Sequence, residues 1–186
     1  ALRDIDFGIY PYTSSTSTIS AYAPVGAGIP GRKLDLVVGV MKAYSTCVGE
    51  GPFTGEMCGA EAEALRKAGG EYGAATGRPR RGGGVDVGAS RYGVTVQGAD
   101  QIALTKLDVL SYLEKIPVCV AYSVAGKLVH KFPWGQDLFE GKPVYDYVEG
   151  WKSDISGCRS KEELPCQLWF NALVELPESG RDRSWF

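Results

Sequence analysis

The residues best suited to chemistry are the arginines of a short glycine-containing loop, Gly73–Arg81. The two glycines of this loop let the backbone approach a ligand closely. Arg78, Arg80 and Arg81 carry planar guanidinium groups, which match the geometry of a carboxylate or a phosphate. The loop therefore indicates an anion-binding site. A solvated basic turn explains the same residues, and the loop by itself leaves both interpretations open.

A second candidate site is the tetrapeptide Thr105–Asp108. The apolar run Gln101–Thr105 predicts a buried strand of a parallel sheet, and open α/β sheets bind ligands at the carboxyl ends of their strands. The Asp108 carboxylate can accept from two guanine N–H groups at once, while the Lys106 stem can lie along the base. The order strand, Lys-x-Asp, helix is similar to the guanine-specificity element of GTP-binding proteins. Alternatively, Asp108 caps a helix that begins at Val109.

Two further segments carry weaker signals. Thr13–Thr18 consists of six hydroxyl residues that can donate to a phosphate, although such loops are usually solvated turns. The glycines of Val48–Phe53 permit close backbone approach to a ligand, but a structural turn explains them equally well. Neither segment identifies a site without further support.

Apolar periodicity and glycine punctuation predict an α/β sheet with appended antiparallel strands. The window Leu34–Tyr44 fits both a helical and a strand period, so the sequence leaves both secondary structures open for it. The other expected elements are a strand leading into a turn within Leu2–Tyr12, helices at Glu56–Gly69, Ala89–Val96 and Val109–Leu113, and a hairpin of Val118–Ser123 with Lys127–Phe132.

Composition narrows the class of protein. The 186 residues suit a single domain, and the net charge of −2 provides no general attraction to nucleic acid or an anionic membrane. No apolar run approaches the roughly 20 residues that span a bilayer. The five cysteines are scattered without a CxxC pair, which predicts reduced thiols in a cytoplasmic protein. The only histidine, His130, is expected to be an ordinary strand residue.

Taken in order, five motifs resemble the adenylosuccinate synthetase family over about residues 1 to 165. They are Asp4–Tyr12, Lys42–Thr46, Val48–Phe53, Gly73–Arg81 and Thr105–Leu110. The resemblance implies part of a P-loop-NTPase-like central sheet with helices on both faces. It implies a ligase that joins IMP to L-aspartate through 6-phosphoryl-IMP, with GTP as a substrate and Mg²⁺ as a cofactor, in a homodimeric protein.

The resemblance also assigns roles to residues. Thr13, Ser14, Val48 and Arg78 are expected to contact IMP. The segment Ala74, Ala75, Thr76, Gly77, Arg78, Pro79 and Arg80 is expected to bind aspartate, and Arg80, Lys106, Leu107, Asp108 and Gly180 are expected to bind GTP.

The chain also departs from the family pattern. Ala75 stands where the family commonly has threonine, so one hydroxyl contact to aspartate is lost at a cost of about 0.5–1.5 kcal/mol. Glu178 replaces a small hydroxyl residue in an atypical tail, 166–186, of what otherwise looks like one partial domain. The chain begins at Ala1, and the phosphate loop, the catalytic aspartate and histidine and the magnesium ligands are expected upstream of it. An isolated fragment of this kind is expected to be inactive, and a non-catalytic nucleotide-binding module is the alternative function.

Overall fold

The computed structural model describes residues 1–159, 163 and 165 of the chain. Gly180 and the tail 166–186 lie outside the described residues. In chain order, with η for a 3-10 helix, the elements are η1 (Ser20–Tyr22), α1 (Ala23–Gly26), β1 (Val38–Lys42), β2 (Tyr44–Cys47), α2 (Gly59–Gly69), β3 (Arg81–Asp86), α3 (Val87–Gln97), β4 (Gln101–Thr105), η2 (Asp108–Tyr112), β5 (Lys115–Val124), β6 (Lys127–Val129), α4 (Gln136–Glu140) and β7 (Lys142–Glu149).

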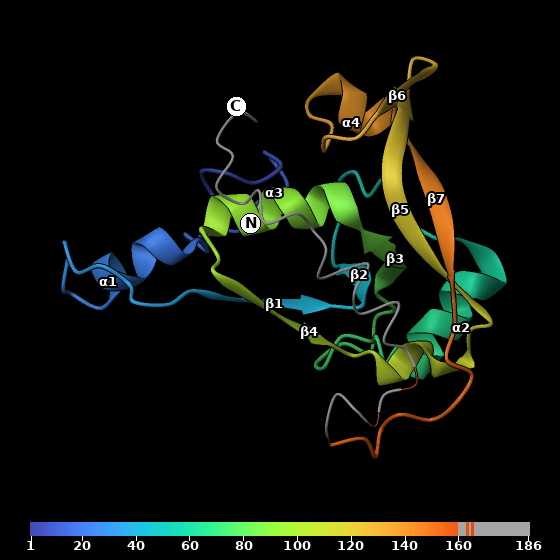
Figure 1. Cartoon of the computed structure of the whole chain (residues 1–186). Coiled ribbons are helices and arrows are strands. Elements are labelled where there is room, and N and C mark those ends of the chain that lie inside the picture. The colour runs from blue at the N-terminus through green and yellow to red at the C-terminus, as the bar shows by residue number, and fades with distance from the viewer. Residues whose placement is uncertain (160–162, 164, 166–186) are drawn as a thin grey trace.

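The described strands form two sheets. β1 and β4 are a parallel pair, in register from Val38 opposite Gln101 to Lys42 opposite Thr105. The second sheet has the order β2-β3-β5-β6, and β7 also pairs with β5. Its β3–β5 pairing is parallel and its other pairings are antiparallel. In Figure 1, α3 lies along one side of the β1–β4 pair, and β5 and β7 form a long twisted ribbon. The predicted α/β class with antiparallel additions is therefore confirmed.

The open window Leu34–Tyr44 contains strands and no helix. β1 ends at Lys42, and β2 begins at Tyr44 after the buried Ala43, so the chain passes from one sheet to the other within a single residue. The β4 strand forms where predicted, but the prediction that it is buried is wrong. Three of its five residues are exposed, because β4 pairs with β1 alone among the described strands.

The predicted strand within Leu2–Tyr12 is also wrong, because this segment folds into turns. The Asp4 carboxylate accepts hydrogen bonds from the backbone N–H groups of Asp6 and Phe7 at 2.9 and 3.0 Å. An aspartate that bonds the backbone ahead of it stabilises a turn and competes with strand pairing. This local bonding overrides the alternation of apolar and acidic residues.

Three helices form near their predicted positions. α2 starts later than expected because Glu56 is bridged to Gly83 of β3, and it ends where Gly70 adopts the left-handed conformation at φ 62°. α3 begins at Val87, where the Asp86 carboxylate accepts from the Ala89 N–H at 2.9 Å. The helix expected after Thr105 is the 3-10 helix η2.

The predicted hairpin joins β5 to β6 through Ala125 and Gly126, which both have positive φ. β6 ends at Val129, short of the predicted end, because Phe132 turns into a buried cluster with Tyr122 and Leu138. His130 follows the strand and is exposed. β7 has no counterpart among the predicted elements, and it pairs with most of β5.

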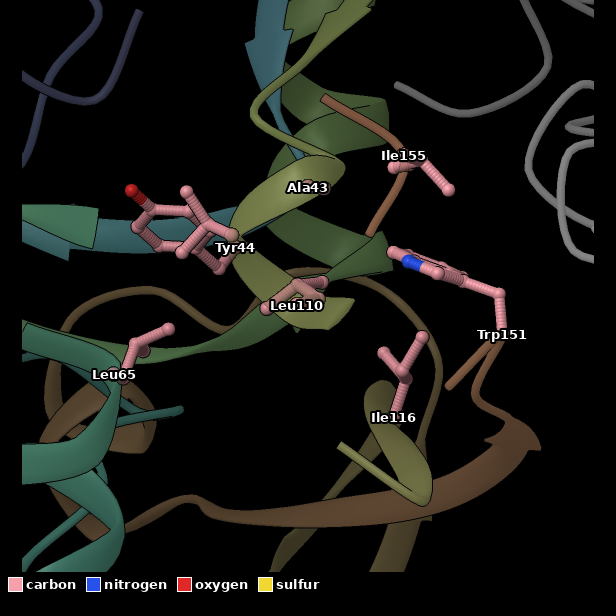
Figure 2. Close-up of a cluster of buried hydrophobic side chains, with 8 residues drawn as sticks. Ala43, Tyr44, Leu65, Leu110, Ile116, Trp151 and Ile155 are labelled. Carbon is pink, nitrogen blue, oxygen red and sulfur yellow. The ribbon is translucent and has the colours of Figure 1, made fainter. Parts of the chain in front are cut away.

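A second buried cluster connects the elements that carry the predicted site residues. Figure 2 shows Tyr44 and Ala43 close to Leu110 of η2, with Leu65 of α2, Ile116 of β5, and Trp151 and Ile155 of the segment after β7 around them. Each of these side chains is at most 8% exposed. Truncating a residue such as Leu65 to alanine typically costs about 2–5 kcal/mol. The cluster therefore fixes η2 relative to the β1–β2 junction.

Candidate functional site

The arginine loop is closed at its base by backbone hydrogen bonds. The Arg80 N–H donates to the Glu71 carbonyl at 3.0 Å, and Tyr72 is bridged to Pro79. Nearer the tip, the Gly73 N–H donates to the Arg78 carbonyl at 2.8 Å. Gly77 has φ 64°, a conformation that side-chain-bearing residues rarely adopt. The loop is thus a tight projection, and residues 74–79 at its tip are all exposed.

The three arginines of this loop have different environments. The exposed guanidinium of Arg78 makes no hydrogen bond or ion pair within the described part of the chain. Arg80 donates to Glu71 at 3.1 Å. Arg81 donates to both oxygens of Glu56, at 2.9 and 2.5 Å, and to the carbonyls of the Val48–Phe53 segment. Arg81 therefore has a structural role, and the idea that all three guanidinium groups face a ligand is wrong.

Sequence reasoning missed Glu71, a buried carboxylate beside the loop that is 5% exposed. Glu71 accepts from Lys42 Nζ at 3.0 Å, Tyr44 Oη at 2.7 Å and Arg80 Nη1 at 3.1 Å. Burial opposes its ionisation, but these hydrogen bonds and the two cations outweigh burial and lower the pKa of Glu71 below its usual value. The sequence signal that could have indicated this residue is its position directly after Gly70, the glycine that ends α2.

The predicted guanine-binding residues line one hollow. Lys106, Leu107 and Asp108 surround a cavity of about 400 Å³, together with Leu104, Ile155 and Ser156. Lys106 has φ 63°, which is unusual for lysine and turns the chain sharply at the end of β4. The two walls of this hollow come from residues about 50 positions apart in the sequence.

Asp108 does not act as the predicted helix cap. η2 begins at Asp108 itself, and Leu107 is the residue at the capping position. The exposed Asp108 carboxylate makes no hydrogen bond or ion pair among the described residues. Both carboxylate oxygens are therefore available to accept hydrogen bonds from a ligand in the hollow.

Arg3 joins two of the segments predicted to contact IMP. The Ser14 N–H and hydroxyl both donate to the Arg3 carbonyl at 2.8 Å. The Arg3 guanidinium donates to the Tyr12 carbonyl at 2.5 Å, the Val48 carbonyl at 2.6 Å and Cys47 Sγ at 2.7 Å. Ser14 and Val48 are thus both bonded to Arg3 although they are far apart in the sequence. Thr13, beside Ser14, is half-buried.

The hydroxyl-rich segment is fixed at both ends. Asp4, which is fully buried, accepts from the N–H of Thr18 and from its hydroxyl at 3.2 Å. Burial opposes ionisation of Asp4, but the backbone hydrogen bonds from Thr18, Asp6 and Phe7 prevail and lower the pKa of Asp4 to about 2. Asp4 and Arg3 therefore hold the two ends of Thr13–Thr18. The segment is thus bonded to the rest of the chain and is not a freely solvated turn.

A larger cavity, of about 560 Å³, is lined by residues of the first turns, such as Arg3 and Tyr12, and by residues of β1 and α3. Its lining includes the polar residues Arg3, Lys42 and Thr46, and the apolar residues Val38 and Val40 of β1 and Val94 of α3. Ser14 and Arg78 are not part of its wall. No hydrogen bond or ion pair in the described part of the chain links Arg78 to Ser14 or Val48.

The described residues do not suit a magnesium ion, since they contain no group of three or more histidine, cysteine, aspartate or glutamate side chains that could hold a metal. The four described cysteines are free thiols. No helix in the described part of the chain has the length and apolar character needed to cross a membrane.

The family that the ordered motifs indicated is confirmed by comparison with known proteins. A profile of the adenylosuccinate synthetase family matches residues 1–174. The chain belongs to the adenylosuccinate synthetase family. The synthetase from Kineococcus radiotolerans is 50% identical over 96% of this chain and 42% of its own length. The synthetase from Cutibacterium acnes is 46% identical over 93% of this chain and 41% of its own length.

A solved structure of a fully ligated adenylosuccinate synthetase from Plasmodium falciparum has the same fold, with a TM-score of 0.86. It is 42% identical to this chain and matches 93% of it, which corresponds to 42% of the Plasmodium chain. This chain therefore spans about two fifths of the length of the synthetases it matches. Its fold is that part of the P-loop-like synthetase fold.

Proposed function

We propose that this chain supplies the guanine, IMP and aspartate contacts of an adenylosuccinate synthase. The complete enzyme joins IMP to L-aspartate with GTP, through 6-phosphoryl-IMP, in purine biosynthesis. One observation carries the proposal. The Asp108 carboxylate lies in a hollow with Lys106, and the described residues provide it with no hydrogen-bond donor.

Guanine fits this hollow for a chemical reason. Its N1–H and its amino group are adjacent donors, and a carboxylate accepts from both in one plane, whereas adenine has no such pair. Charge-assisted hydrogen bonds of this kind contribute about 1.5–3 kcal/mol each. The Lys106 stem and Leu107 lie at the same hollow and can cover the face of the base. Gly180 belongs to the same proposal, although it lies outside the described residues.

The other two substrates are bound by the remaining predicted segments. Thr13, Ser14 and the backbone at Val48 bind IMP, in the arrangement that Arg3 holds. The exposed loop Ala74–Arg80 binds aspartate. Arg78 bonds the aspartate carboxylate and IMP, because its guanidinium has no partner in the described part of the chain and a forked donor matches a carboxylate. The chain's contribution is thus to hold and orient reactants, which lowers the entropic part of the barrier.

Magnesium and the acid–base groups are assigned to parts of the enzyme outside this chain. The metal would neutralise charge on the transferred phosphoryl group. The described residues contain no group of side chains that fits the metal. The family resemblance further suggests a cytoplasmic homodimer.

Isothermal calorimetry of the purified chain with GTP, IMP and ATP tests the binding part of this proposal, alongside circular dichroism to establish folding. We expect binding of GTP in preference to ATP. A folded chain that binds GTP and ATP equally contradicts the guanine site.

For the reaction itself, residues 1–174 can replace the matching segment of the Kineococcus radiotolerans synthetase, and adenylosuccinate formation is then measured. A folded chimera without activity contradicts the proposed function.

A further inference from the structure

The Glu71 carboxylate connects three elements that are separate in the sequence. Lys42 is the last residue of β1, Tyr44 is the first residue of β2, and Arg80 directly precedes β3. All three donate to Glu71, at 3.0, 2.7 and 3.1 Å respectively. One buried carboxylate therefore fixes the ends of strands from both sheets to the base of the arginine loop.

This cluster retains positive charge. Glu71 is ion-paired with both Lys42 and Arg80, so two cations share a single carboxylate. The Lys42 and Arg80 side chains are 29% and 35% exposed, whereas the Glu71 side chain is only 6% exposed. In addition, the buried Nε of Arg80 has no hydrogen-bond partner in the described part of the chain. The exposed side of the cluster is therefore cationic, which suits an anionic ligand.

The cluster also lies beside the predicted guanine site. Lys42 is opposite Thr105 in the β1–β4 register, and the Ala43 N–H donates to the Thr105 carbonyl at 2.9 Å. Burial, then Glu71, and then the charge of Asp108 raise the pKa of Tyr44 above its usual value, so Asp108 acts electrostatically on a member of this cluster. Base-binding and cationic groups thus lie at the same end of the β1–β4 pair.

We propose that Glu71 is a positioning residue for the nucleotide, because it holds the Lys42 ammonium and the Arg80 guanidinium where they bind the phosphates of GTP. Glu71 does not contact the substrate itself, since its oxygens are buried and occupied. Its charge keeps two like-charged groups together next to Asp108. The inference rests on the proposed function, and it adds a residue that acts through its neighbours.

The test uses the chimera of residues 1–174 with the Kineococcus radiotolerans synthetase. Glu71→Gln keeps the shape of the side chain and can still accept from Tyr44, but it removes the charge that binds Lys42 and Arg80. We expect KM for GTP to rise about tenfold, the effect of losing roughly one charge-assisted bond. KM for IMP should change less than about threefold, because Ser14 and Val48 are held by Arg3 instead.

Glu63→Gln is the matched control, because Glu63 also pairs with an arginine, Arg66, but on the exposed face of α2. This control should leave all Michaelis constants unchanged. A double-mutant cycle provides a further check. In an Arg80→Ala background, Glu71→Gln should raise KM for GTP much less than in the unsubstituted chimera.

A Glu71→Gln chimera with an unchanged KM for GTP overturns the positioning role, even if kcat falls through partial unfolding. Equal increases in KM for all three substrates also overturn it, because they indicate a general structural role. If the unsubstituted chimera folds but is inactive, the proposed function fails separately. The positioning role is then decided by calorimetry with GTP. An affinity loss of about tenfold or more in Glu71→Gln, relative to the unsubstituted chimera, supports the role. Equal affinities of the two proteins, or no GTP binding by the unsubstituted chimera, overturn it.

Discussion

Arg78 and Asp108 are charged side chains of the predicted site that have no hydrogen bond or ion pair within the described residues. Both are exposed, so water solvates them in the absence of a ligand and no buried charge is left uncompensated. Arg81, three positions after Arg78, instead donates to both oxygens of Glu56 and to two backbone carbonyls. At the scale of the residue, a charged side chain whose donors are all bonded within the protein is structural, whereas one with free donors or acceptors is available to a ligand.

Asp108→Asn should weaken GTP binding by about 10- to 100-fold, because one charge-assisted hydrogen bond to guanine is lost. The same substitution should favour XTP in relative terms, since an amide can donate to the additional oxygen of xanthine. Calorimetry of the chain with both nucleotides measures this change. Asp35→Asn, at an exposed aspartate outside both cavities, serves as the control. An unchanged preference for GTP rules out base recognition by Asp108.

Arg78→Leu should raise KM for aspartate or lower kcat by about tenfold or more in the chimeric synthetase, because an anion loses its forked donor. Steady-state kinetics with aspartate and IMP varied in turn measure the effect. Arg32→Leu removes an exposed arginine far from the loop in sequence and should have little effect. Normal constants for both substrates in Arg78→Leu are incompatible with the role proposed for Arg78.

At the scale of the element, the segments that carry the site are held by single buried or half-buried charged residues. Asp4 closes the turn at the start of the chain and bonds the end of the hydroxyl-rich segment at Thr18. Arg3 bonds the beginning of that segment and the loop at Val48. These segments contain no helix or strand, so side-chain hydrogen bonds replace the backbone ladders that fix regular elements.

Asp4→Asn should lower the stability of the chain at neutral pH, because a neutral amide accepts the N–H bonds of Thr18, Asp6 and Phe7 less strongly. The pKa of Asp4 is about 2, below the usual value near 3.9, so its stabilising contribution is present above about pH 4 and is lost as pH falls towards 2. The difference between wild type and Asp4→Asn should therefore shrink over this range.

Urea unfolding followed by circular dichroism, at several pH values between neutral and about 2, measures the effect of Asp4→Asn. Asp35→Asn, at an exposed aspartate, should follow the wild-type curve throughout. A stability difference between wild type and Asp4→Asn that stays constant across this range contradicts the assignment to Asp4 ionisation.

At the scale of the whole molecule, the β1–β4 pair leaves large apolar side chains exposed. Val38 and Val40 of β1 are 47% and 75% exposed, and Ile102 of β4 is 37% exposed. Two strands alone cannot bury both faces, and their outer edges present unpaired backbone groups within the described residues. Such a surface favours association between chains.

We therefore expect the isolated chain to self-associate at high concentration and Val40→Lys to reduce this tendency, since a charge on an exposed strand opposes edge pairing. Sedimentation velocity over a concentration series measures the effect. Leu128→Lys, at a 60% exposed position on β6, is the control and should change self-association less. A chain that stays monomeric, or equal effects of the two substitutions, would show that the chains do not associate through β1.

Much of the local structure could be read from neighbouring residues. The end of α2 at Gly70, the β5–β6 turn at Ala125 and Gly126, and the position of β4 depend on local conformational preferences or on a short apolar run. The site motifs were recognisable for a similar reason, since Gly73–Arg81 and Thr105–Asp108 are contiguous in the chain. Their chemistry is visible in the order of residue types.

Only the tertiary structure decided which charged residues meet. Arg3 lies 45 positions from Val48, Lys42 lies 29 positions from Glu71, and Ile155 lines the same hollow as Asp108, so no local pattern indicates these pairs. The turn at Asp4 and the exposure of β4 also depend on partners that periodicity does not reveal. The sequence alone determined the family and the contiguous motifs, because both depend on residue order. The roles of Glu71 and Arg81 were decided by folding, because a counter-charge from a distant segment determines whether a side chain remains available to a ligand.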